Sequence, residues 1–515
     1  MRLHSGPFAS RWLLAATVGS IGVLVAGTTA LAGGLTAGTL ALAPDDPLAG
    51  NAACAGLVAS QTAKGSVNFN DAEVEPYVVA DPTNPQHLVA AFQQDRWNDG
   101  GANGATTVVS DNGGASWSLA SAQPKFTICD GATPGDPGGL NRASDPWVSI
   151  GPDGTVYQAS LSFNANGPAF GGTSGVVAST SSDGGNTWGP VTNVQLDPST
   201  TVLNDKESIT ADPNKAGTAY LVWDRLVSPS TNANPTAFVH TPAFRGPALI
   251  SKTTDGGKTW SPSRVFFDPG QNNQTIGNQI VVEPDGTLID GLDLILNKGA
   301  KGNPRSAFLV AVMRSTDGGA TWSAPVVVSQ IIDVPVSING QGVRTGDILP
   351  EFAVDPVSGA LYAAWQTESG SAPGVAGIDF SQSTDQGRTW SAPIEVDQAG
   401  GLAAFTTQVH VAADGTVGVV FYQFENTTSG LTDEFIVHCH AATDNCSQLS
   451  NWTSGGKTKL NTTAFDMATA PNAGGFFTGD YEGLASTGNT FDSFFVMAQP
   501  VATRGQTDPF ANTAG

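Results

Sequence analysis

Short runs of alternating apolar and polar residues, interrupted by turn signals, make up most of the chain after residue 70. His87-Leu-Val-Ala-Ala-Phe92 and Ala219-Tyr-Leu-Val-Trp223 are typical runs, and Pro or Asp-Gly turns precede many of them. A period of two residues places successive side chains on opposite faces of a strand, whereas a helix needs a period near 3.6. The pattern therefore predicts an all-β chain of short strands joined by tight turns.

One octapeptide recurs five times, and reads S-T-D-G-G-A-T-W at Ser315 to Trp322. A short carboxylate in the middle of a tight turn can accept backbone N–H groups, the glycines take positive φ, and the tryptophan folds back as an apolar plug. We therefore expect five hairpin loops that stabilise a structural repeat. Their third residues are Asn112, Asp183, Asp255, Asp317 and Asp385, and their tryptophans are Trp117, Trp188, Trp260, Trp322 and Trp390.

A second, weaker repeat lies between the octapeptides. Each copy begins with an acidic or polar residue and continues with an alternating strand, a turn and another strand. Four short strands per repeat without helical periodicity are typical of a β-propeller. We favour seven blades closed by strands from both termini, with 57–69 as donor of the missing outer strands; six blades plus a terminal extension is the alternative. The seven starts are Glu75, Asp145, Glu207, Asn278, Glu351, Thr407 and Asp480.

The N-terminus has the features of an export signal. Arg2 and Arg11 precede an uncharged run from Trp12 to Pro44, and small residues such as Ala41 and Ala43 offer a cleavage site. An uncleaved membrane anchor facing outside is the alternative, because the run is long enough to span a bilayer. We expect a secreted monomer with an export signal over 1–43, an N-terminal segment over 44–69 that closes the last blade, a propeller over 70–500 and a tail over 501–515.

Composition narrows the range of partners. The formal net charge of −23 would repel a nucleic acid. Hydrophobic residues make up 40% and charged residues 13%, which is enough apolar material for a large core. We expect no nucleic-acid partner, and a membrane contact only through an uncleaved N-terminus.

Four cysteines become potential disulfides if the chain is exported. Cys439 and Cys446 flank a turn-like segment, which leaves Cys54 and Cys129 as the other pair. His438 and His440 alternate with Cys439 and so lie on the opposite strand face, which argues against a metal site there. No contiguous calcium loop is present, and Ca²⁺ bound by oxygen-rich loops remains an alternative rather than a required cofactor.

The octapeptides match the Asp-box, or bacterial neuraminidase repeat, S-x-D-x-G-x-x-W. The chain from about residue 70 to 500 resembles the sialidase-like β-propeller superfamily, which contains exo-sialidases, other glycoside-cleaving propellers and non-enzymatic members. The resemblance implies that the Asp-boxes lie on the face opposite the ligand site and act as scaffold. It also implies that the first strand of each blade starts beside the central channel, on the ligand face.

A sialidase site clamps the substrate carboxylate with three arginines and uses an Asp acid/base and a Tyr nucleophile whose proton a Glu removes. The resemblance implies Tyr481 as nucleophile, Glu207 or Glu351 as its base and Asp145 as acid, in a retaining exo-α-sialidase mechanism on terminal, sialic-acid-like sugars. Three of Arg96, Arg142, Arg225 and Arg344 would form the clamp. Further contacts to the glycan are expected from Trp97, Trp147, Glu75, Asp205 and Asp480, with Lys206 interleaved among the acidic starts.

One departure leaves a second function open. Sialidases begin the first blade with Arg-Ile-Pro, and this chain has Val74-Glu75-Pro76 there, so an arginine is missing beside a carboxylate. The alternative is a non-catalytic propeller that binds a glycan, a peptide or a cation on its acidic face. Convergence of at least three arginines near Tyr481 would distinguish the two functions.

Overall fold

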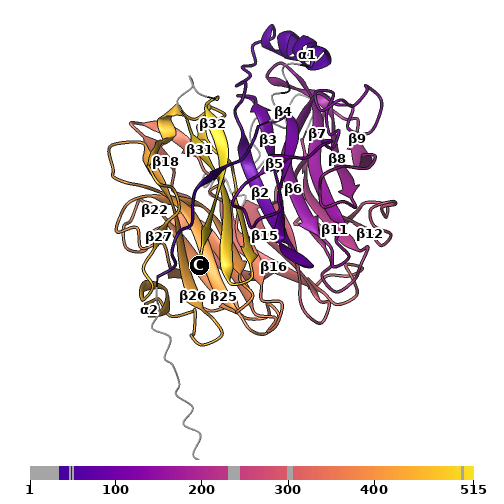
Figure 1. Cartoon of the computed structure of the whole chain (residues 1–515). Coiled ribbons are helices and arrows are strands. Elements are labelled where there is room, and N and C mark those ends of the chain that lie inside the picture. Colours follow the sequence, from indigo (N-terminus) through magenta and orange to yellow (C-terminus); the bar gives the residue numbers. More distant parts are fainter. Residues whose placement is uncertain (1–33, 46–47, 49–50, 230–243, 298–305, 500–503) are drawn as a thin grey trace, which may run out of the picture. The chain divides into compact units, whose positions relative to one another are not determined.

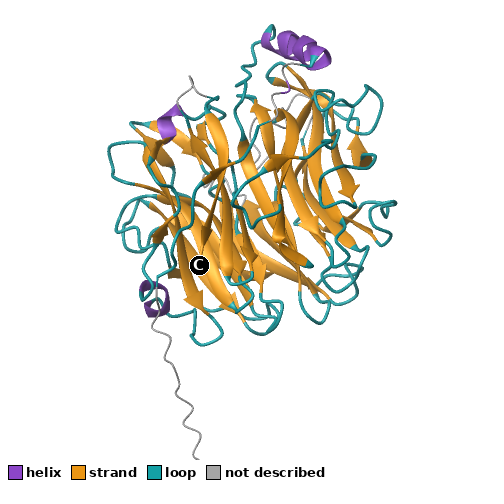
Figure 2. Cartoon of the chain, in the orientation of Figure 1, coloured by secondary structure: helices purple, strands orange, loops and turns teal. Residues whose placement is uncertain are grey.

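The computed structural model describes residues 34–515 except 46–47, 49–50, 230–243, 298–305 and 500–503. Strands dominate these residues, with two α-helices, α1 (Ala52–Thr62) and α2 (Ser450–Thr453) (Figure 2). The prediction of an all-β chain is therefore confirmed. No helix in the described ranges is long and apolar enough to cross a membrane. Most of the predicted export signal lies outside the described residues.

The chain forms a series of four-stranded antiparallel units in sequence order (Figure 1). A single bridge between Ala102 and Ala143 links the first two units into one larger sheet. The first three units contain β2 (Val74–Asp81), β3 (Asn84–Arg96), β4 (Ala102–Ser110) and β5 (Ser118–Leu119); β6 (Arg142–Ile150), β7 (Val156–Asn166), β8 (Ala169–Ser181) and β9 (Thr192–Asp197); and β10 (Val202–Ala211), β11 (Ala219–Val227), β12 (Ala248–Thr253) and β13 (Arg264–Phe267).

Three further units follow the same order. They contain β14 (Gln274–Val282), β15 (Leu288–Asn297), β16 (Ser306–Ser315) and β17 (Val326–Ile331); β20 (Glu351–Val354), β21 (Leu361–Glu368), β22 (Ala376–Ser383) and β23 (Ile394–Glu395); and β24 (Ala404–Val411), β25 (Thr416–Phe424), β26 (Leu431–His440) and β27 (Thr458–Lys459), with β28 (Phe465–Asp466) also on β26. A small sheet joins β18 (Val336–Ile338), β19 (Gln341–Arg344) and β29 (Phe476–Phe477).

The last unit combines both ends of the described chain. Its order is β30 (Gly483–Thr487), β31 (Thr490–Ala498), β32 (Thr507–Ala514) and β1 (Ala41–Leu42). Two details differ from the sequence expectation. Part of 57–69 lies in helix α1, because this Ala-rich stretch lacks strand alternation and Asn51 caps it by accepting from the Ala53 N–H at 3.0 Å. The expected tail contains β32, which pairs along its whole length with β31.

The first strands contact one another in the order β2, β6, β10, β14, β20, β24 and β30, and β30 returns to β2. They therefore surround a common centre, as in a β-propeller. Apolar side chains fill the space between neighbouring units; Phe352 and Trp365, for example, pack with Ile289 and Val312 of the preceding unit.

The octapeptides connect third and fourth strands. In the fourth copy the Asp317 carboxylate accepts from the Thr321 N–H and the Ser315 hydroxyl, both at 2.8 Å, and the Trp322 indole N–H donates to the Gly319 carbonyl at 3.1 Å. Asn112 accepts the Ser116 N–H at 3.0 Å in the same way. The carboxylate or amide oxygen thus satisfies backbone donors inside each turn.

Most first strands carry a β-bulge near their beginning. A bulge residue lies in the left-handed region, with φ of 54° at Glu75, 53° at Asp145, 47° at Lys206, 68° at Gly277 and 47° at Thr406. An extra residue in one strand bends that strand and redirects its side chain. In three consecutive units this places a charged side chain toward the common centre.

Candidate functional site

A cavity of about 500 Å³ opens where the first strands begin. It is lined by residues from the bulges of β6 and β10, from the β3–β4 loop and from the segments before β20 and β30. Six of its charged residues carry the argument below: Arg96, Asp145, Asp205, Lys206, Arg344 and Asp480.

Lys206 is the central cation of the site. Its Nζ lies 2.9 Å from Asp480 Oδ2, 3.6 Å from Glu75 Oε1 and 3.8 Å from Asp145 Oδ2. Although burial opposes protonation, the three carboxylates, with Asp145 first, raise the pKa of Lys206 above its usual value. One ammonium group therefore links carboxylates from three different first-strand segments.

Three non-glycine residues hold strained backbone at this point. Glu75, Asp145 and Lys206 all have positive φ, a conformation that costs about 1 to 3 kcal/mol for an ordinary side chain. Gly277 takes the same place in the next unit without a side chain. Such strain persists only where the surroundings enforce it, and here ion pairs with Lys206 hold the side chains of Glu75 and Asp145.

The carboxyl groups of the site differ in ionisation. Burial opposes ionisation of Asp480, but Arg344 and Lys206 hold its pKa well below the usual range. Burial also opposes ionisation of Asp145, but Lys206 and the Ser144 hydroxyl, which donates at 2.7 Å, lower its pKa. Burial raises the pKa of Glu75 well above the usual range despite Lys206. Asp145 and Asp480 therefore line the cavity as ionised carboxylates, and the buried Glu75 beside Lys206 retains its proton.

Two further carboxyl groups on the cavity wall have raised pKa values. Burial, followed by the charge of Asp145, raises the pKa of Asp205 to about 7. Burial and the neighbouring Asp333 raise the pKa of Asp347 to about 7. Carboxyl groups whose environments separate their pKa values are suited to acid and base roles in one site.

Of the four candidate arginines, two line the cavity. Arg96 donates to Gln93 Oε1 at 2.7 Å and its guanidinium lies 4.8 Å from the Phe477 ring centre. Arg344 donates from Nε to Asp480 Oδ1 at 2.8 Å, and its guanidinium lies 4.4 Å from the centre of the same Phe477 ring. The second pair of arginines is engaged elsewhere: Arg142 with Asp99 at 2.5 Å, and Arg225 with Asp197 at 2.8 Å.

Tyr481 lies beside the cavity and is buried. Its hydroxyl donates to the Pro146 carbonyl at 3.3 Å, its ring is 5.3 Å from the Trp147 ring, and Lys206 Nζ is 5.3 Å from its ring centre. Burial and the surrounding carboxylates, with Glu75 first, raise the pKa of the phenol well above its usual value. The hydroxyl is therefore protonated at neutral pH and needs a strong base to act as a nucleophile.

The two candidate bases share a smaller cavity of about 20 Å³ with Tyr481. Both carboxylate oxygens of Glu207 are buried without a hydrogen-bond partner among the described residues, and burial raises its pKa well above the usual range. Glu351 Oε2 accepts from Gln279 and Gln408 at 2.8 and 2.9 Å, and burial raises its pKa to about 8. Asp145 and Lys206 line both cavities, so the two are adjacent.

The two candidate sugar-stacking tryptophans are packed. Trp97 is fully buried, donates to Asn103 Oδ1 at 2.9 Å and lies under the Arg142 guanidinium. Trp147 stacks on Tyr77 with ring centres 3.7 Å apart and lines only the smaller cavity. Among the described residues, no group of three or more His, Cys, Asp or Glu side chains is arranged to hold a metal ion.

Sequence reasoning placed Lys206 among the acidic starts but did not identify it as their common partner. The available signal was its position between Asp205 and Glu207, inside the start of a blade. Asp347 precedes its strand by four residues, and the loop conformation carries it to the cavity.

Comparison with known proteins supplies one sequence relative. No family model matches the chain. A sialidase from Bacteroides fragilis is 31% identical over 136 residues, which are 23% of this chain and 24% of that protein, so the match spans about a quarter of the relative's length.

Similar solved structures have lower sequence identity. They include a Hadza microbial sialidase (14% identity, 71% of this chain and 65% of that chain, TM-score 0.44) and an α-L-arabinanase from Penicillium chrysogenum complexed with arabinobiose (13%, 75% and 94%, 0.46). A mutant of the NanB sialidase from Streptococcus pneumoniae has 10% identity, with 87% and 94% covered and a TM-score of 0.45. The chain is similar to the sialidase-like β-propellers.

Proposed function

We propose that the protein is a glycoside hydrolase that cleaves terminal sugars from glycans in the cavity around Lys206. The observation that carries the proposal is the separation of ionisation states within one cavity: Asp145 and Asp480 have lowered pKa values, whereas Asp205 and Asp347 have raised ones. Glycoside cleavage needs an acid that protonates the leaving oxygen and a negative group that stabilises the positive charge of the transition state.

The sharper form of the proposal is retaining exo-sialidase chemistry. Tyr481 attacks the anomeric carbon, Glu207 takes its proton, and a cavity carboxyl group protonates the leaving oxygen. Asp205 suits the acid role better than Asp145, because its pKa of about 7 keeps much of it protonated near neutral pH, whereas Asp145 is ionised. Lys206, 5.3 Å from the Tyr481 ring centre, would stabilise a developing phenolate.

The arginines support a wider sugar range than sialic acids. Two arginines line the cavity rather than three, and Arg344 already holds Asp480. Arg96 alone has guanidinium hydrogens without an acidic partner, and its Nε is buried without a hydrogen bond. A carboxylate on the substrate would gain little from this arrangement, so uncharged terminal sugars belong in the test.

The proposal also covers the location, oligomeric state and blade number of the protein. We propose a secreted monomer whose four-stranded units close as seven blades, with the Asp-box loops on the face opposite the cavity. Support comes from the succession of contacts between first strands and from Asp-box contacts to first-to-second strand turns, such as the Gly113 N–H donating to the Gln86 carbonyl at 2.9 Å.

Turnover of fluorogenic glycosides tests the function. Wild-type protein, Tyr481→Phe and Asp205→Asn are compared on an α-sialoside and on uncharged glycosides, including an α-L-arabinofuranoside, from pH 4 to 8. Tyr157→Phe is the matched control, because Tyr157 is also buried and its hydroxyl has no hydrogen-bond partner in the described part of the chain.

We expect turnover by the wild type and the control and a loss of at least about a hundredfold in Tyr481→Phe. Turnover of uncharged sugars alone would reject the sialidase form and keep the hydrolase. No turnover of any glycoside by folded protein would reject the hydrolase in favour of a non-catalytic propeller that binds a glycan, a peptide or a cation.

A further inference from the structure

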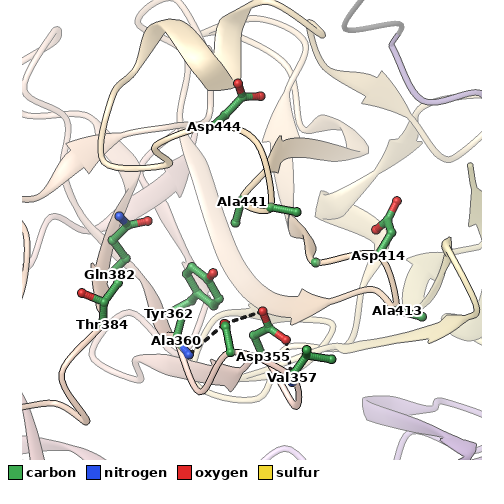
Figure 3. Close-up of a pocket in the computed structure, with 13 residues that line it drawn as sticks. Asp355, Val357, Ala360, Tyr362, Gln382, Thr384, Ala413, Asp414, Ala441 and Asp444 are labelled. Carbon is green, nitrogen blue, oxygen red and sulfur yellow. Dashed lines mark hydrogen bonds between the residues drawn. The ribbon is translucent and has the colours of Figure 1, made fainter. Parts of the chain in front are cut away.

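A second cavity, of about 480 Å³, lies at the opposite end of β20 from Glu351 (Figure 3). Three turns form its walls: the turn from Asp355 to Ala360, the turn around Asp414 and the segment from Ala441 to Asp444. The disulfide between Cys439 and Cys446 closes the last of these loops, so that wall is covalently constrained. None of its lining residues is shared with the cavity around Lys206.

The charge of this second cavity is negative. Asp355, Asp414 and Asp444 line it, and none of its lining residues is Lys, Arg or His. Backbone contacts fix two of the carboxylates: Asp355 Oδ1 accepts the Val357 N–H at 2.8 Å, and Asp414 Oδ1 accepts the Thr416 N–H at 2.9 Å. A cationic ligand therefore meets acidic groups from three separate turns.

A tyrosine side chain, Tyr362, lines the same space. Tyr362 is only 2% exposed, yet its hydroxyl has no hydrogen-bond partner among the described residues. Figure 3 shows its side chain between Gln382 and Asp355, with Ala441 close by. Burial, and then the charge of Asp355, raises the pKa of Tyr362 to about 12, so the hydroxyl stays neutral. This hydroxyl group, on the cavity wall and without a protein partner among the described residues, is available to a ligand.

The remaining lining is apolar and small. Ala360, Ala413, Ala441 and Ala442 contribute methyl groups, and Val357 is 82% exposed. Such a wall suits a slender methylene chain, because it offers apolar area without filling the cavity.

We propose that this cavity binds a primary alkylammonium group, as carried by the lysine side chain of a partner polypeptide. The methylene stem would lie against the alanines, the ammonium group would lie beside Asp355 and the Tyr362 oxygen, and Asp414 and Asp444 would add negative charge to the cavity wall. Lysine fits better than arginine, because a planar guanidinium prefers one bidentate carboxylate, whereas these carboxylates come from separate turns. The chain's net charge of −23 favours approach of a basic partner.

Binding of N-acetyl-lysine methylamide to the full chain, measured by calorimetry and NMR, tests the proposal. N-acetyl-norleucine methylamide has a similar aliphatic side chain without the charge. N-acetyl-arginine methylamide has a guanidinium group in place of the ammonium group. Putrescine tests whether the ligand is a free small-molecule amine rather than the lysine side chain of a polypeptide. The variants are Asp414→Asn and Tyr362→Phe, and Asp153→Asn is the matched control, since Asp153 accepts the Thr155 N–H in the corresponding turn of another unit.

We expect saturable binding of the lysine probe, at least about fivefold weaker binding of the norleucine and arginine probes, and about tenfold weaker binding in Asp414→Asn. Asp153→Asn should bind like wild type.

Equal affinity for lysine and norleucine, or an unchanged affinity in both site variants, would overturn the proposal. Tighter binding of putrescine would reject the polypeptide source, and displacement of the lysine probe by equimolar Ca²⁺ would reject the ammonium site in favour of a metal site. If Tyr362→Phe fails to fold, the affinity of Asp414→Asn for the lysine probe still tests the proposal.

Discussion

At the scale of single residues, the charge of Lys206 holds the ionised Asp145 and Asp480, which would otherwise repel each other, beside the protonated Glu75. Its side chain is 10% exposed, and those of Glu75, Asp145 and Asp480 are nearly or fully buried. Removing one partner of a buried ion pair costs about 3 to 5 kcal/mol, because it leaves charge without compensation. The cluster therefore depends on this one ammonium group for its stability as well as for its geometry.

We predict that Lys206→Met lowers the free energy of unfolding by about 3 to 5 kcal/mol at neutral pH. Lys215→Met is the matched control: Lys215 pairs with Asp212 at 3.3 Å, but its side chain is 54% exposed, and exposed pairs contribute about 0 to 1 kcal/mol. Denaturant unfolding followed by tryptophan fluorescence measures both. Equal losses in the two variants would show that the carboxylates do not need Lys206.

Asp205 gives a prediction about pH that does not require catalysis. Its pKa is 3.8 in an unfolded chain and about 7 in the folded protein, so the folded state binds its proton more tightly. Stability from this group is fully present below about pH 4 and is lost as pH rises toward 7. We therefore expect Asp205→Asn to be more stable than wild type at pH 8, and the difference to shrink at pH 5.

Thermal unfolding of wild type and Asp205→Asn at pH 5 and pH 8 measures this difference. If Asp205 is also the proposed acid, turnover by wild type should fall as pH rises through about 7, while Asp205→Asn should lack that limb. A variant with the same pH dependence of stability as wild type would mean that the carboxyl group titrates near its ordinary value.

At the scale of elements, two disulfides fix segments of very different reach. The Cys54–Cys129 bond spans 75 residues and ties helix α1 to the loop between β5 and β6, whereas Cys439–Cys446 spans seven. Loop-closure entropy assigns about 4.5 kcal/mol to the longer loop and about 2.5 kcal/mol to the shorter one. The longer bond should therefore matter more to stability, although it lies outside the repeated sheets.

We predict that replacing Cys54 and Cys129 together by alanine lowers the melting temperature more than replacing Cys439 and Cys446 does. Paired replacement avoids a free thiol that could form wrong disulfides. Calorimetric melting of the two double variants beside wild type decides the order. A larger loss of melting temperature in the Cys439 and Cys446 variant would show that tethering α1 contributes little to stability. It would also show that the cavity wall formed by 441–444 contributes more.

The elements also show where sequence reasoning succeeds. The period of two residues and the octapeptides predict the strands and their hairpin turns, because both signals are local. The bulges at Glu75, Asp145 and Lys206 follow no local rule, since φ values near 50° at charged residues are enforced by tertiary ion pairs. Sequence could therefore name the acidic starts of the site, but not the residue that joins them.

At the scale of the molecule, the predicted repeat of four strands matches the observed units, while the closing segments do not follow from pattern. β32 reads Thr507-Asp-Pro-Phe-Ala-Asn-Thr-Ala514, in which Pro and Asn weaken a strand signal. It is nevertheless central in its sheet, because β31 pairs with it on one side and β1 on the other. Long-range pairing overrides weak local propensity here, and a reading of local signals alone takes the segment for a tail.

This closure leads to a prediction about truncation. A chain that ends at Ala498 lacks β32, which leaves β1 without its partner and exposes the edge of β31 and the buried Phe494 and Phe495. We expect this variant to unfold without a sharp transition or to aggregate, because an open hydrophobic edge strand invites intermolecular pairing. Deleting Met1–Gly33 is the control, since Gly34–Gly515 forms a compact unit without those residues. A synthetic peptide of residues 504–515, added in trans, should restore part of the cooperative transition by pairing with β31. A truncated protein that melts at the wild-type temperature without the peptide would mean that the ring of first strands holds without this closing strand.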